Sequence, residues 1–124
     1  MRMISATALL LFVPALAAHA GEGDINGLWA RGDGKARVKI GKCGSDICAV
    51  NVWIKPGTSG EAVGDRLVMD VEPVADGRYE GRASDPKRGL TYNITITAGA
   101  SSMTTRGCVL GKLLCKSVSW SRLQ

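Results

Sequence analysis

Polar and apolar residues alternate in short runs along most of the chain after residue 20. Residues 35–40, for example, read K-A-R-V-K-I, with charged and aliphatic side chains in turn. A period of two is typical of a β-strand with one buried face, and no helix-length stretch shows a period of 3.6 residues. The pattern predicts eight strands, at about residues 27–31, 35–42, 47–55, 66–71, 77–83, 90–97, 101–107 and 115–123.

The connections between these strands are short and rich in glycine, aspartate and proline, which favour tight turns. One longer loop, from Pro56 to Gly64, is expected to form a mobile lip. Consecutive antiparallel hairpins in this number favour an all-β fold, a small antiparallel β-barrel of about eight strands, because closure removes exposed strand edges. A two-sheet sandwich is the alternative.

Residues 1–20 have the three parts of a secretory signal. Arg2 provides the positive charge, the segment from Ala6 to Leu16 is apolar, and Ala18-His19-Ala20 ends in a small-residue cleavage site. The apolar segment is shorter than the roughly 20 residues of a transmembrane helix. We therefore predict cleavage after Ala20, a single domain over residues 21–124, and a periplasmic or secreted protein with no membrane-spanning segment.

Export would change the chemistry that the chain can perform. His19 is the single histidine of the sequence, and it leaves with the leader. Nucleophilic sites of the Ser-His and Cys-His types and histidine metal sites are then excluded. Arg2 also leaves with the leader, so 15 basic and 11 acidic residues remain and the formal net charge is a mild +4; no nucleic-acid partner is predicted. We expect no catalytic residues and no cofactor, and the protein is predicted not to be an enzyme.

Four cysteines occur in two tight pairs, Cys43/Cys48 and Cys108/Cys115. In an oxidising compartment such pairs close as disulfides, and their spacings lack the C-x2-C form of zinc and redox sites. Three connectivities exist, and we favour the two local bridges. Pairing Cys108 with Cys115 places Met103 opposite Trp120 and separates polar from apolar side chains, which supports that bridge.

The hairpin over residues 35–55 is less well determined. If Cys43 lies opposite Cys48, then Val38 lies opposite Trp53, but the aliphatic row of Val50, Val52 and Ile54 falls on the charged side. A bulge at Gly41 would restore a consistent register. Alternatively the aliphatic row lies outside, covered by the long loop, by lysine stems or by another subunit. The sequence leaves both open.

An ordered series of short motifs runs through the whole of residues 27–122. It consists of Gly27-Leu28-Trp29, Val38-Lys39-Ile40, Cys43-Gly44, Ile47-Cys48, Val52-Trp53-Ile54-Lys55, Gly81, Asp85-Pro86, Gly89, Thr91-Tyr92, Arg106-Gly107-Cys108-Val109-Leu110-Gly111, Leu114-Cys115 and Ser119-Trp120-Ser121-Arg122. The series resembles a family of small exported bacterial proteins described as domain of unknown function 2147. This resemblance implies a lipocalin-like barrel and no established activity. Typical members carry a longer proline-rich segment where this chain has Pro56 to Gly64.

Candidate ligand contacts are the large side chains that an unfilled barrel would turn inward. They are Trp29, Trp53, Tyr79, Tyr92, Met103 and Trp120. The simpler interpretation of the three tryptophans is that they fill the core. Asp70 and Glu72 share a strand face and could serve as an acid and base, but solvated carboxylates are the simpler interpretation.

Two classes of function remain. The first is an exported, non-enzymatic barrel that binds a small apolar ligand in its interior. The second is an interaction protein, such as an inhibitor or a factor bound to an envelope component, that acts through its surface around a filled barrel. The basic row of Lys35, Arg37 and Lys39, extended by Lys42, is expected to be a solvated face or a site for anionic envelope groups. An interior pocket of roughly 300 Å³ or more would favour the first class.

Overall fold

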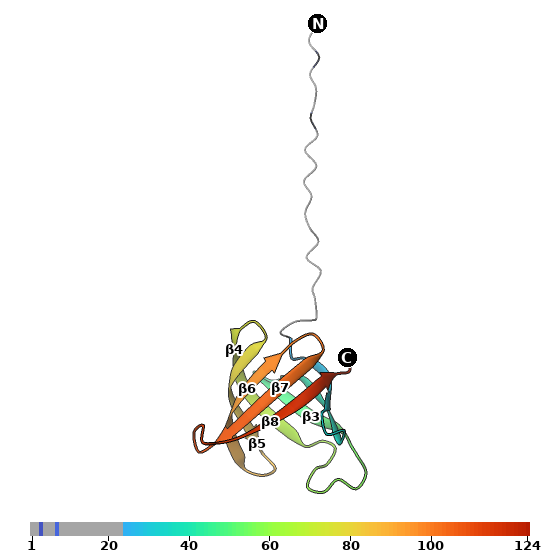
Figure 1. Cartoon of the computed structure of the whole chain (residues 1–124), viewed down its shortest axis with the longest axis vertical. Helices are drawn as coiled ribbons and strands as arrows, with labels where there is room; N and C mark the ends of the chain where they lie inside the picture. The colour runs from blue at the N-terminus through green and yellow to red at the C-terminus, as the bar shows by residue number, and fades with distance from the viewer. Residues whose placement is uncertain (1–2, 4–6, 8–23) are drawn as a thin grey trace.

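Eight antiparallel strands, each hydrogen-bonded to the next, close into a barrel when β8 meets β1 (Figure 1). The computed structural model describes Met3, Thr7 and residues 24–124. The strands are β1 (Gly27–Arg31), β2 (Ala36–Cys43), β3 (Asp46–Ile54), β4 (Arg66–Ala75), β5 (Arg78–Asp85), β6 (Leu90–Ala98), β7 (Ser102–Val109) and β8 (Leu114–Arg122). The described residues contain no helix. The all-β barrel is thus confirmed, whereas the cleavage point after Ala20 and nearly all of the predicted leader lie outside the described residues.

The β7–β8 hairpin has the register that the sequence predicts. Cys108 pairs with Cys115, and Met103 pairs with Trp120. Both local disulfides are present, Cys43–Cys48 and Cys108–Cys115, and no described cysteine is free. The alternation in β6 and β7 places Ile94, Ile96 and Met103 inside the barrel and exposes Thr97, Thr104 and Arg106 outside it.

The first hairpin differs from the predicted register. Cys43 pairs with Asp46 across a two-residue turn in which Gly44 has a φ of 68°, so the Cys43–Cys48 bridge joins diagonal positions. The register shift lies beside Val52, not at Gly41. Trp53 consequently pairs with Arg37 rather than Val38. Its ring lies on the outer face, 4.9 Å from the Arg37 guanidinium carbon, so the prediction that it points inward is wrong.

Strand β4 is longer than predicted because it continues through Pro73 to Ala75. The β3–β4 pairing stops at Met69, so residues 70–75 pair with β5 alone. Proline is tolerated in such an edge segment because no neighbour needs its missing N–H. Asp70 and Glu72 are both exposed on this segment.

One end of the barrel is sealed by the segment that precedes β1. The Trp29 side chain is fully buried, and its indole N–H donates to the carbonyl of Ile25 at 2.9 Å. The Arg122 guanidinium lies 4.2 Å from the centre of the Trp29 ring and donates to the Ala100 and Asn26 carbonyls. Trp29 therefore closes this end of the barrel, and its burial agrees with the interpretation that it fills the core.

Candidate functional site

The barrel interior contains a cavity of about 620 Å³ that opens at the end opposite Trp29. Successive strands turn alternate side chains inward, so the cavity wall draws on nearly every strand. The wall is mainly aliphatic and aromatic. Its apolar members include Val38, Ile40, Ala49, Leu67, Met69, Tyr92, Ile94, Ile96, Met103, Val118 and Trp120.

Most charged side chains that border the cavity, such as Arg31, Glu61 and Arg88, belong to strand ends and connections at its mouth, and few polar groups lie deeper. The Trp120 indole N–H donates to the Thr105 hydroxyl at 3.0 Å, so the indole N–H is already satisfied. The Tyr92 ring lies against the backbone of Gly107, where a side chain would collide with it. Burial raises the pKa of the Tyr92 phenol, which stays a neutral donor and acceptor at the cavity wall. A ligand held here would make mostly apolar contacts and a small number of directional ones.

Four connections surround the open end: residues 32–35, 55–65, 86–89 and 110–113. Figure 1 shows three of them at the lower end of the barrel, in green, tan and dark orange. The longest, from Lys55 to Asp65, extends beside the mouth between β3 and β4. We refer to it as the mouth loop.

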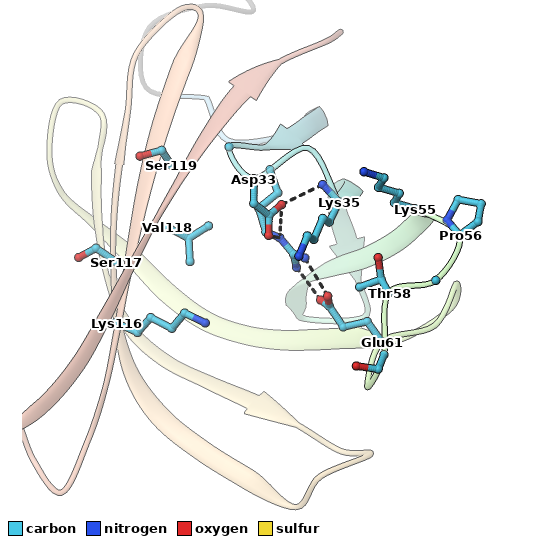
Figure 2. A pocket seen from close by; sticks show the side chains of 14 residues that line it. Asp33, Lys35, Lys55, Pro56, Thr58, Glu61, Lys116, Ser117, Val118 and Ser119 are labelled. Atoms are coloured by element: carbon cyan, nitrogen blue, oxygen red, sulfur yellow. Dashed lines mark hydrogen bonds and ion pairs between the residues drawn. The ribbon is translucent and has the colours of Figure 1, made fainter.

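Arg31, at the end of β1, fastens the mouth loop to the barrel. Its guanidinium donates two hydrogen bonds to Glu61 at 2.5 and 2.7 Å and others to Asp33 at 3.0 Å (Figure 2). The hydrogen bonds from Arg31 hold the pKa of Glu61 below its ordinary value. The same contacts raise the pKa of Arg31, so the pair is ionised at neutral pH.

The turn between β5 and β6 fastens the mouth loop a second time. Arg88 donates to the carbonyl of Gly60 and to the Asp85 carboxylate, and Lys87 forms an ion pair with Asp65 at 3.0 Å. The loop that the sequence predicts as a mobile lip is thus anchored to two neighbouring segments.

The wall of the barrel is incomplete between β1 and β8. Strand β1 ends at Arg31, and its last backbone contact with β8 is the hydrogen bond from the Gly32 N–H to the Ser119 carbonyl at 2.7 Å. The segment of β8 from Leu114 to Val118 therefore pairs with β7 alone. A polar cleft of about 910 Å³ lies over this gap, between β8 and the mouth loop (Figure 2).

The cleft and the interior cavity share the side chains at the gap: Arg31, Glu61, Lys116 and Val118. Figure 2 shows Lys116 extending from β8 into the cleft, facing the mouth loop that carries Glu61. Lys116 forms no ion pair with any described residue. An uncommitted ammonium beside an apolar cavity suits the negative end of an amphipathic molecule.

The structure divides the six candidate ligand residues into two groups. Tyr92, Met103 and Trp120 lie together on the cavity wall. Trp29 is buried at the sealed end, Trp53 lies outside, and Tyr79 borders a separate polar cleft at the sealed end. Neither Asp70 nor Glu72 borders the cavity or the two clefts. Among the described residues, no group of three or more His, Cys, Asp or Glu side chains could hold a metal ion.

The charged residues at the mouth were not identified from the sequence. Arg31 and Glu61 are 30 positions apart and meet only when β1 and the mouth loop reach the same end of the barrel. Lys116 pairs with Gly107 at an inward-facing position of β8, one residue beyond the Cys108–Cys115 pair that the sequence predicts. A charged side chain on an otherwise apolar strand face is the sequence feature that could have identified Lys116 as a site residue.

Replacing Glu61 with glutamine is expected to loosen the mouth loop at neutral pH. Because the folded-state pKa of Glu61 is lowered, its ionised form stabilises the closed loop above its ordinary pKa near 4.5, and that stabilisation is lost as pH falls through the lowered value. Amide protection factors at Thr58 and Gly64 should therefore fall in Glu61→Gln at pH 7. In the wild type they should fall only below about pH 4.5.

The matched control is Glu80→Gln, which removes an exposed ion pair with Arg78 away from the mouth loop. It should leave the protection of Thr58 and Gly64 unchanged. Equal protection in the wild type and in Glu61→Gln at pH 7 would show that Arg31 and Glu61 do not fasten the loop.

Comparison with known proteins gives one match. Residues 27–122, from the start of β1 to the end of β8, match the family model described as an uncharacterized protein conserved in bacteria, DUF2147. No curated protein and no solved structure matches this chain. Among the described residues there is no helix long and apolar enough to cross a membrane. Since the match covers the whole barrel, the chain belongs to the DUF2147 family.

Proposed function

We propose that this protein is an exported, non-enzymatic binding protein that holds a small, mainly apolar ligand inside its barrel. The observation that carries the proposal is the interior cavity of about 620 Å³. Small-molecule sites commonly have volumes of about 300–1,000 Å³ and mostly apolar walls with few polar groups. A filled barrel would have favoured the alternative of a protein that acts only through its surface.

The distribution of charge suggests the shape of the ligand. The deep part of the cavity is bounded by Ile96 and Met103, which are 0 % and 3 % exposed, and offers no charged group. Lys116 stands where the cavity meets the cleft between β8 and the mouth loop. An amphipathic molecule with an apolar body and an anionic head would match both regions, because only the head would remain near water.

The location is part of the same proposal. Two disulfides close hairpins in this bacterial protein, and bacteria keep disulfides mainly outside the cytoplasm. Together with the predicted leader, they support a periplasmic or secreted protein.

Native mass spectrometry of protein isolated from its own bacterium without denaturation tests the proposal. We expect a fraction of the protein to carry one small molecule. Organic solvent should release this molecule, and it should partition into the organic phase as a lipid does. Protein that is wholly free of ligand, and that binds none of the lipids extracted from the same cells, would contradict the proposal and favour the surface-acting alternative.

A further inference from the structure

The hairpin between β7 and β8 exposes a cluster of large apolar side chains at the open end. Leu110, Leu113 and Leu114 are 71 %, 83 % and 60 % exposed. Val109 and Leu90 stand beside them, also exposed, on the inner rim of the cavity. These five residues, the apolar tip, are half of the ten large apolar side chains that are exposed among the described residues.

A disulfide and a side-chain hydrogen bond hold the hairpin that carries the apolar tip. The Cys108–Cys115 disulfide joins the two strands just below it, and the Asn93 side-chain amide donates to the Gly111 carbonyl at 3.2 Å. Leu110 has a φ of 53°, a left-handed conformation that bulky side chains rarely adopt. A leucine that is both strained and exposed adds little to the stability of the fold. We therefore attribute Leu110 to contact with a binding partner outside the chain.

The open end is also where the positive charge of the barrel is concentrated. The strand ends and connections over residues 31–35, 55–66, 85–90 and 109–116 carry eight basic and four acidic side chains. The rest of residues 24–124 carries seven basic and six acidic side chains. All four acidic groups of the open end are already paired with arginine or lysine, whereas Lys112 and Lys116 have no such partner among the described residues.

We propose that the apolar tip docks this barrel onto a lipid bilayer with anionic headgroups, with the mouth of the cavity facing the membrane. Exposed leucines flanked by lysines suit the boundary between headgroups and acyl chains, where apolar side chains insert and basic ones meet lipid phosphates. Leu90, Val109 and Leu114 continue the apolar wall of the cavity out to the tip. A docked barrel would thus offer a lipid-like molecule an apolar path between bilayer and cavity.

Flotation with lipid vesicles tests this proposal without any cavity ligand. The oxidised protein should float with vesicles of phosphatidylcholine and phosphatidylglycerol at low salt, and much less with phosphatidylcholine alone. Leu110→Ser/Leu113→Ser should reduce the partition coefficient about tenfold, because two inserted side chains are lost. Lys112→Glu keeps both leucines. It should reduce binding to vesicles that contain phosphatidylglycerol and leave binding to phosphatidylcholine vesicles unchanged.

The matched control is Val74→Ser/Leu123→Ser, which removes two exposed apolar side chains at the sealed end and should bind like the wild type. Unchanged denaturant midpoints would show that the variants are folded. Equal flotation of the wild type and Leu110→Ser/Leu113→Ser would overturn the proposal. It would also be overturned if the wild type floated equally with both vesicle types, or if sedimentation showed a dimer that this double variant abolishes.

A failure here is distinguishable from a failure of the proposed function. Loss of membrane docking with intact ligand binding would leave a carrier that meets its ligand in solution. Docking without any bound ligand would leave a membrane-associated barrel of another kind.

Discussion

Replacing Trp29 with alanine is expected to lower the free energy of unfolding by about 3–5 kcal/mol, the usual loss for a fully buried large aromatic side chain. The ring is 0 % exposed, its N–H is bonded to the Ile25 carbonyl, and Arg122 packs over its face. The substitution would leave a void at the sealed end and remove the partner of a guanidinium. Urea unfolding of the oxidised protein measures the loss.

Trp53→Ala is the matched control because it deletes the same side chain from the outer face. Trp53 is partly exposed and contacts the Arg37 guanidinium, an interaction worth about 1 kcal/mol or less at such sites. Trp53→Ala should lower the free energy of unfolding several-fold less than Trp29→Ala. Similar losses of unfolding free energy in the two variants would mean that Trp29 does not close the sealed end of the barrel.

Replacing Ala49 with phenylalanine is expected to weaken binding of an apolar probe roughly tenfold or more, a change of about 1.4 kcal/mol. Ala49 faces the cavity from β3, so a phenyl ring would occupy space that the ligand needs. Since the cavity can accept the ring, stability should change by only about 1 kcal/mol. Titration with N-phenyl-1-naphthylamine, followed by its fluorescence, measures the affinity.

Thr104→Phe provides the control for that experiment. Thr104 lies on β7 with its side chain exposed outside the barrel, away from the cavity and the clefts described above. It should leave the probe affinity unchanged. If both phenylalanine variants bind the probe as the wild type does, the probe is bound somewhere other than the interior.

The β7–β8 hairpin was predictable in detail, and the first hairpin was not. In β7 and β8 the cysteines lie directly opposite one another, so strand parity and the disulfide give the same register. In β2 and β3 the turn closes at Gly44 and the cysteines become diagonal partners. The sequence shows that the row of Val50, Val52 and Ile54 conflicts with the charged face of the preceding strand. It does not show that Val52 itself occupies the irregular position.

The candidate site shows the same division. The inward positions of Tyr92, Met103 and Trp120 follow from alternation along single strands, which is a local signal. The contact between Arg31 and Glu61 depends on where a loop travels after β3, and no local pattern encodes that path. Whether inward side chains fill a barrel or leave a cavity depends on the packing of all eight strands together.

Methyl NMR of the oxidised protein with an added amphipathic ligand, such as a medium-chain fatty acid, tests the central claim most directly. We expect shifted and exchange-broadened signals from Ile40, Ile96 and Met103, which line the cavity, with Val74 as an unshifted exterior reference. Shifts confined to Val74 and other exterior methyls, or none at saturating ligand, would contradict the account of this barrel as an interior-binding protein.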